Sequence, residues 1–174
     1  MIEIRQIDQA HAGDLALKND PFPIWGRMIP ALQDGVWSYR TEKFDRVSEQ
    51  TFPDECYDFE ELSRDGAAFA AYEDGVCLGL AIYKKGFFNY WYLEDLKVCA
   101  AARRKGVGRA LIRSGLDYAK TQGYVGVYLQ AQDNNLSACL FYLSCGFEIG
   151  GFDNRVYDGT SQAGKADIYF YARA

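Results

Sequence analysis

Residues 103–109, Arg-Arg-Lys-Gly-Val-Gly-Arg, combine two glycines with four cations directly before a segment of helical periodicity. The first N–H groups of a helix have no partner inside it and carry the positive end of its dipole. Gly106 and Gly108 lack a Cβ atom, so an anion can approach the backbone closely. Because the whole chain carries a net charge of −5, this segment reverses the local charge. We predict that it binds a phosphate group; a solvated glycine turn is the plainer alternative.

The spacing around this loop argues against two common kinds of phosphate site. A dinucleotide site has the pattern Gly-x-Gly-x-x-Gly directly after a strand, with an acidic residue about 20 positions later. Here Leu111 stands at the third glycine position, and residues 99–105 separate the loop from the expected strand. No Gly-x-x-x-x-Gly-Lys-Ser/Thr segment occurs in the chain. Nucleotide hydride transfer and P-loop chemistry therefore fit poorly.

The elements that position this loop follow from the hydrophobic pattern. Residues 12–34 contain Pro21, Pro23 and Pro30, so we expect only short helices there. Residues 73–75, Glu-Asp-Gly, predict a hairpin turn. Strands are expected over residues 2–7, 36–44, 67–72, 76–83 and 90–98, and an acidic loop or short helix over 53–65.

The hydrophobic period then becomes helical. A helix is expected from Val107 to a stop at residues 122–123, and a short helix over 136–143 that Gly146 ends. Strands are expected over residues 125–131, 147–157 and 166–171. This alternation implies a parallel strand pair joined by a right-handed crossover. We predict one mixed α/β domain over residues 1–174.

Several short motifs, in this order along the chain, resemble the acetyl-coenzyme A signature of the GNAT N-acetyltransferases. They are Val98, Arg103-x-x-Gly106-x-Gly108, Asn135-x-x-Ala138-x-x-x-Tyr142 and Gly146-Phe147. Residues 20–30, 92–99, 132–147 and 156–160 are similar to the streptothricin acetyltransferases of that superfamily. The resemblance implies a three-layer fold with a mixed, mostly antiparallel central sheet, a splayed parallel strand pair and flanking helices.

The resemblance also implies acetyl-CoA as cosubstrate, with no metal. The pantetheine arm would lie between the splayed strands, the pyrophosphate would lie on the loop at 103–109, and Tyr142 would be the general acid. A core aromatic is the plainer interpretation of Tyr142. The cofactor-binding residues implied in this way are Leu96, Lys97, Val98, Arg103, Arg104, Lys105, Gly106, Val107, Gly108, Arg109, Asn135, Ala138 and Tyr142.

The group that deprotonates the acceptor amine is left open. Many relatives carry a glutamate on the strand matching residues 125–131, but here that position is Gln130, and an amide cannot act as a base. Glu94 and Asp95 are the substitute catalytic candidates. Strict alternation in a strand lets only one of them face a given cleft and places Asp95 on the side of Leu93. An ion pair with Lys97 or an arginine is the plainer role for each carboxylate, and a water chain is a further alternative.

An acidic and aromatic stretch is the candidate acceptor side. Residues 54–65 contain six acids with Tyr57 and Phe59 between them, and five aromatic residues lie between positions 87 and 92. The resemblance implies a small-molecule amine, streptothricin with its cationic β-lysine arm, which such a surface attracts. A solvated loop is the plainer interpretation. Another amine acceptor (polyamine, aminoglycoside or protein lysine) and an acetyl-CoA-binding module without catalysis remain alternatives.

Composition limits the partners and the compartment. The pI of about 4.9 disfavours broad binding to nucleic acid or to an anionic membrane. No apolar run approaches the roughly 18–20 residues that cross a bilayer, and the first residues have no secretory pattern. Five cysteines without Cys-x-x-Cys spacing predict reduced thiols in a cytoplasmic protein, and the single His11 lacks neighbours for a metal site. A homodimer is left open.

Overall fold

The computed structural model describes residues 2–174, and the chain divides into two compact units that we describe separately. The first unit comprises Met1–Pro21, Thr51–Val127 and Arg173–Ala174, and the second comprises Phe22–Gln50 and Tyr128–Ala172. The single domain expected from the sequence stays a prediction.

The elements follow one another in the order strand, 3-10 helix, hairpin, helix, three strands, two helices, strand, helix and two strands. They are β1 (Glu3–Gln6), η1 (Gln9–Ala16), β2 (Phe22–Gln33), β3 (Val36–Gln50), α1 (Phe59–Asp65), β4 (Gly66–Glu73), β5 (Val76–Lys85), β6 (Tyr90–Val98), η2 (Ala100–Ala102), α2 (Val107–Thr121), β7 (Gly126–Gln132), α3 (Leu136–Ser144), β8 (Glu148–Asp153) and β9 (Asp167–Arg173).

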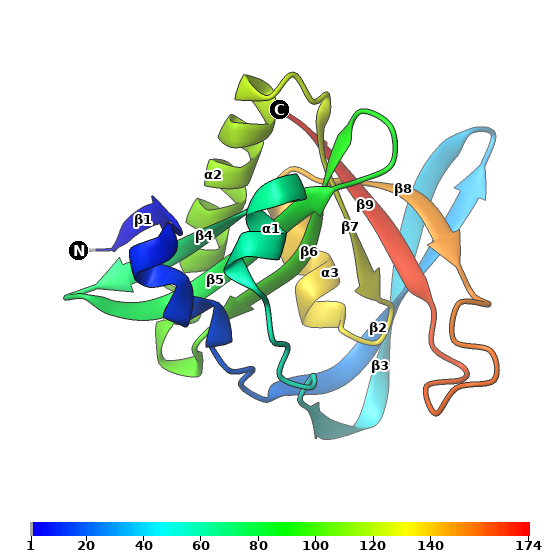
Figure 1. The fold of residues 1–174 in the computed structure, drawn as a ribbon. Coiled ribbons are helices and arrows are strands. Elements are labelled where there is room, and N and C mark those ends of the chain that lie inside the picture. Colours follow the sequence, from blue (N-terminus) through cyan, green and yellow to red (C-terminus); the bar gives the residue numbers. More distant parts are fainter. Residues whose placement is uncertain (1) are drawn as a thin grey trace. The chain divides into compact units, whose positions relative to one another are not determined.

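The strands confirm the predicted mixed α/β class. Seven strands follow the order β1-β4-β5-β6-β7-β9-β8, and β2 and β3 form a two-stranded sheet (Figure 1). The pairs β1–β4, β4–β5, β5–β6 and β8–β9 are antiparallel. The pair β6–β7 is parallel, as the alternation of strands and helices predicted. The splaying of this pair stays a prediction.

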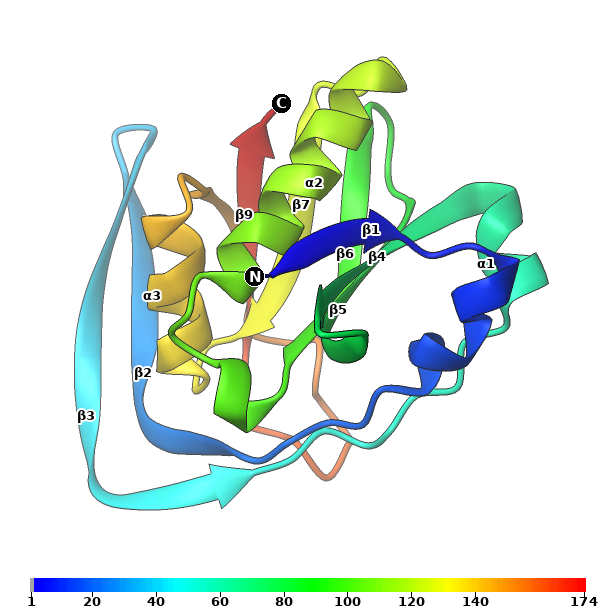
Figure 2. The same ribbon diagram turned by 90° about the vertical axis from the view of Figure 1, so that its left-hand side faces the viewer.

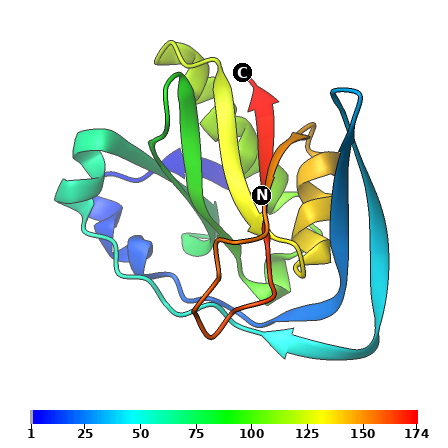
Figure 3. The same cartoon turned by 90° about the vertical axis from the view of Figure 1, so that its right-hand side faces the viewer.

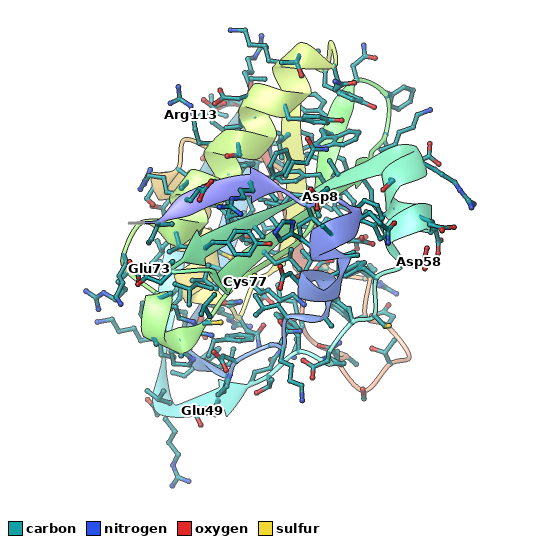
Figure 4. All side chains as sticks on the ribbon, turned by 60° about the vertical axis from the view of Figure 1, so that its left-hand side comes forward. Asp8, Glu49, Asp58, Glu73, Cys77 and Arg113 are labelled. Carbon is teal, nitrogen blue, oxygen red and sulfur yellow. The ribbon has the colours of Figure 1, made fainter. Side chains whose placement is uncertain are left out.

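In the first unit, helices cover both faces of β4, β5 and β6 (Figure 2). On one face α2 packs closely, because Gly79 and Gly115 leave room for Val107 and for the ring of Tyr83. On the other face η1 and α1 contribute to a buried core cluster, against which Cys77, labelled in Figure 4, also packs. The buried members of that cluster are Ile7, Leu15, Leu62, Ala68, Ala70, Tyr72, Leu80 and Ile82.

The predicted hairpin turn is present, and a second local signal, an aspartate cap, begins α1. Asp74 and Gly75 have φ angles of 51° and 79°, the left-handed conformations that a tight two-residue hairpin turn requires. Asp58, labelled in Figure 4, caps α1, because its carboxylate accepts a hydrogen bond from the Glu61 N–H at 2.8 Å. The segment expected over 53–65 as an acidic loop or short helix is a loop up to Asp58 and a short helix over Phe59–Asp65.

The expectation of short helices over residues 12–34 holds only for η1, which lies in the first unit. In the second unit it is wrong, because β2 is a twelve-residue strand that contains Pro23 and Pro30. Met28 N–H bonds to Asp133 O at 2.9 Å, on the side of β2 that faces away from β3. Pro30 shares this side because N–H groups two residues apart point the same way, so its missing N–H removes no bond to β3. The resulting hairpin runs beside α3 (Figure 3).

The strand expected over 147–157 is too long. It ends at Asp153, whose carboxylate Oδ1 accepts hydrogen bonds from the N–H groups of Arg155 and Val156 at 2.8 and 3.0 Å. An aspartate that bonds the backbone two and three residues onward stabilises a turn instead of a strand.

Candidate active site

A β-bulge in β6 brings the two candidate bases to one side of the strand. Ile82 of β5 pairs with Asp95, and the next residue, Tyr83, pairs with Leu93, so Glu94 is an extra residue in β6. Such a bulge breaks the alternation of side chains. The expectation that Asp95 shares the side of Leu93 is therefore wrong. Leu93 is paired on the face of α2, whereas Asp95 is paired with a member of the core cluster on the opposite face.

Each of these carboxylates has a lysine partner. Glu94 Oε2 lies 2.7 Å from Lys84 Nζ, and Asp95 Oδ2 lies 2.9 Å from Lys97 Nζ. The Asp95 pair is much the more buried, since the Asp95 and Lys97 side chains are only 13% and 5% exposed. Ion pairing, the plainer role of both residues, is thus present. It does not exclude basicity, because a paired carboxylate still accepts a proton.

Tyr57 lies beside both ion pairs. Its hydroxyl lies 3.0 Å from Glu55 Oε2 and 3.4 Å from Asp95 Oδ2. Lys84 Nζ and Lys97 Nζ lie 5.5 and 5.9 Å from the centroid of the Tyr57 ring, at cation–π distance. Glu55 also lies 3.6 Å from Lys97 Nζ. We call Glu55, Tyr57, Asp95 and Lys97 the β6 polar cluster.

The β6 polar cluster contains a carboxylate suited to proton transfer near neutral pH. Burial raises the pKa of Asp95 to about 6; Lys97 opposes this rise and Glu55 adds to it. Burial, with Asp95 and Glu55 next in importance, raises the pKa of Tyr57 far above its ordinary value. Tyr57 therefore stays a hydrogen-bond donor, while Asp95 changes its charge in the physiological range.

The glycine loop at 103–109 lies where α2 begins. Gly106 is the N-cap residue in a left-handed conformation, with φ of 85°, and no side chain caps the helix. The first internal bond is made by Ala110 N–H to Gly106 O at 3.0 Å. A Cβ atom at Gly106 would meet nothing within 4 Å, so the space in front of the helix start is open within the described residues. This arrangement suits an anion.

The cations of this loop have different roles. Arg103 donates from its guanidinium to the backbone carbonyls of Val98, Asp20 and Pro21 at 3.1, 3.1 and 2.7 Å. Its side chain therefore stabilises the loop by bonding to neighbouring backbone. Arg104 and Lys105 are exposed, and Arg104 has a positive φ of 63°. Of these three cations, Arg104 and Lys105 are the ones positioned to meet an anion from solvent.

The candidates of the second unit lie on α3 and at its N-cap. The side chain of Asn135 caps this helix by accepting from Ala138 N–H at 3.2 Å, which gives both residues a structural role. The Tyr142 ring packs against Phe141, Phe147 and Phe170, with centroids 5.5, 5.9 and 5.9 Å away. The half-buried ring therefore packs against the core residues Phe147 and Phe170, and the acid role of its hydroxyl stays a prediction.

The residues of the acidic stretch and of the aromatic stretch lie in different surroundings in the structure. Within residues 54–65, Glu55 belongs to the β6 polar cluster, Asp54 accepts from Asn19 N–H at 2.8 Å, and Glu60 and Glu61 are exposed in the first turn of α1. Trp91 packs on Tyr118 and Tyr124 as a core residue, whereas Phe88 is 95% exposed. Composition marked Glu55 and Tyr57 only as part of an acidic, aromatic stretch.

The sequence offered the Lys97 side chain only as one possible ion-pair partner of the two candidate base carboxylates. Its burial, at 5% exposed, was not indicated, because alternation cannot tell a buried lysine from an exposed one. Burial raises the pKa of Cys139 to about 12 and of Cys77 to about 11, so both thiols stay protonated at neutral pH. Across residues 2–174 we find no cluster of side chains able to hold a metal, and no helix there is long and apolar enough to cross a membrane.

Known proteins resemble this chain along its whole length. The family model of the acetyltransferase (GNAT) family matches residues 30–147. Streptothricin acetyltransferase A of Bacillus subtilis (strain 168) is 34% identical over 97% of this chain and 98% of its own. A crystal structure from Bacillus anthracis str. Ames, assigned as a streptothricin acetyltransferase and solved with acetyl coenzyme A, has 30% identity and a TM-score of 0.89 over 100% and 99% of the chains. Nourseothricin acetyltransferase, 24% identical, shares the fold with a TM-score of 0.81 over 99% and 98%.

Proposed function

Because the chain belongs to the acetyltransferase (GNAT) family, we propose that it transfers the acetyl group of acetyl-CoA to a primary amine of streptothricin or a closely related small cation. The observation that supports streptothricin as the acceptor is the full-length similarity to streptothricin acetyltransferase A, which extends well beyond the cofactor motifs. The β6 polar cluster supports it, because two carboxylates and an aromatic ring attract an alkylammonium group.

The start of α2 is the proposed holder of the cosubstrate. Its uncapped N–H groups, the open space at Gly106 and the exposed Arg104 and Lys105 fit a pyrophosphate. Backbone groups of residues 96–98 would hold the pantetheine arm. Asn135 and Ala138 match the family positions beside the cofactor. Acetyl-CoA supplies the acetyl thioester.

Asp95 is the proposed base. The acceptor amine is charged at neutral pH and cannot attack until it loses a proton. Asp95 has a raised pKa of about 6 and is therefore ionised, yet still basic, at neutral pH. Glu94 is more exposed than Asp95 and forms an ion pair with Lys84. Tyr142 is the proposed acid. The reference pKa of the tyrosine side chain is near 10 and that of a thiol near 8.5, so a phenol can donate its proton to a leaving thiolate.

The function is tested by following thiol release from acetyl-CoA with streptothricin, an aminoglycoside, a polyamine and a lysine peptide as acceptors. We expect the highest kcat/KM with streptothricin. A higher kcat/KM with another amine would leave the family assignment unchanged and would make that amine the acceptor. Binding of acetyl-CoA by calorimetry without turnover of any amine would instead indicate a non-catalytic module.

A further inference from the structure

The ammonium group of Lys97 is buried among acidic groups. Its side chain is 5% exposed, and its Nζ lies 2.9 Å from Asp95 and 3.6 Å from Glu55. A buried charge is costly unless another charge compensates for it. Lys97 acts on Asp95 chiefly by coulombic attraction and secondarily by a hydrogen bond, and both lower the pKa of the Asp95 carboxyl group.

We propose, building on the acetyl transfer inferred above, that Lys97 is a positioning residue that keeps the Asp95 carboxylate ionised and fixed for removal of the acceptor's proton. In this step one N–H bond of the acceptor ammonium breaks and an O–H bond forms on Asp95. The electron pair of the broken bond stays on nitrogen and can attack the acetyl carbon. No oxidant or reductant takes part.

The charges around Asp95 explain why Lys97 has this effect. From β6 itself, Lys97 faces Asp95, while Glu94 is matched by Lys84 of β5 at 2.7 Å. From the segment before α1, Glu55 and the Tyr57 hydroxyl face it. The opposite residue on β5 is the apolar Ile82. Lys97 is thus the cation in direct contact with Asp95 among the described residues, and without it Asp95 faces a second carboxylate in a largely buried site.

The proposal is tested first without acetyl-CoA. The carboxyl carbon of Asp95, assigned with Asp95→Asn, is titrated by ¹³C NMR in the free protein. We expect a midpoint near pH 6 in the wild type. In Lys97→Met the midpoint should rise by about one pH unit or more, because an adjacent opposite charge typically lowers a carboxyl pKa by about 1–3. Lys97→Arg keeps the cation and should restore the wild-type midpoint.

Lys84→Met is the matched control, since it removes the other lysine that pairs with a β6 carboxylate and touches the Tyr57 ring. It should leave the Asp95 midpoint in place. If Lys97→Met does not fold, Lys97→Gln removes the charge and keeps a polar side chain of similar reach. An unchanged Asp95 midpoint in these neutral variants would overturn the proposal.

The second readout is the acid limb of kcat/KM. It should move in Lys97→Met by the same amount as the NMR midpoint and stay in place in Lys84→Met. A shifted NMR midpoint with an unshifted acid limb would overturn the link between Lys97 and catalysis. Failure of the proposed function would look different, because the wild-type protein would then acetylate no amine whatever the titration of Asp95.

Discussion

Leu93 and Asp95 are two residues apart in β6 and yet lie on opposite faces of it. Their partners on β5 are consecutive: Tyr83, which donates to Leu111 O of α2, and Ile82, which belongs to the core cluster on the other face. The extra residue Glu94 makes the difference. As a result both carboxylates reach the side on which Tyr57 lies, and the choice between them depends on burial and pairing instead of direction.

The first prediction concerns the pH dependence of turnover. Burial raises the pKa of Asp95 to about 6, and a base acts only when deprotonated. In the wild type, kcat/KM should therefore fall below about pH 6 and be level above it. Asp95→Asn should lower it by about 10²–10⁴-fold at neutral pH. The remaining rate should rise steadily with pH, because only the neutral amine can attack. Thiol release across a pH series measures both curves.

Glu94→Gln is the control for that experiment, because it neutralises the neighbouring ion-paired carboxylate. It should keep the level region above pH 6. The reverse pattern, with Asp95→Asn near wild type and Glu94→Gln impaired, would assign the base to Glu94. A steady rise with pH in the wild type would favour a water chain.

The second prediction concerns the start of α2. Gly108→Val should weaken acetyl-CoA binding about tenfold or more, since a branched side chain beside the uncapped N–H groups keeps a phosphate from them. Calorimetry measures the affinity. Lys120→Ala removes a cation from the last turn of the same helix and should leave the affinity unchanged. Equal affinities in Gly108→Val and the wild type would place the phosphates elsewhere.

The third prediction separates the two roles of Tyr142. Phenylalanine keeps the ring that packs on Phe147 and Phe170, so Tyr142→Phe should retain acetyl-CoA affinity. Loss of a general acid should lower kcat by up to about 10²–10⁴-fold, and by less where the leaving group is a thiolate. Single-turnover rates measure this step. Wild-type kcat in the variant would leave Tyr142 with its core role alone.

The fourth prediction concerns the packing of α2. Gly115→Ala improves helix propensity by about 1 kcal/mol, but its Cβ would overlap the buried ring of Tyr83. Overpacking typically costs about 1–3 kcal/mol, so the free energy of unfolding in urea should fall. At Gly13 a Cβ would meet nothing within 4 Å, so Gly13→Ala should have no such cost. A Gly115→Ala protein as stable as the wild type would contradict this packing.

Most elements were predictable because their signals are local. The turn at Asp74 and Gly75, the limits of β6 and the end of α2 depend on turn residues and periodicity within a few positions. The course of β2 was not predictable in this way. A strand accommodates Pro30 only where the proline nitrogen faces away from the partner strand β3. Proline alone does not carry that information.

The candidate site likewise has a part that local sequence predicts and a part that it does not. The loop at 103–109 was predictable because glycines and cations adjoin a helix start. The β6 polar cluster was not predictable as a unit, because it joins the segment of Glu55 to Lys97 across 42 positions and depends on a bulge that alternation does not show. Arg103 was assigned to the anion by its charge, whereas its side chain binds backbone carbonyls of its own unit.

The central claim, acetyl transfer to streptothricin, is tested most directly by mass spectrometry of the drug after incubation with the protein and acetyl-CoA. We predict a product that carries one added acetyl group on an amine of the β-lysine arm, formed in step with thiol release. Asp95→Asn under the same conditions should yield far less of it. Unmodified streptothricin, recovered from a preparation that acetylates another amine, would contradict the claim.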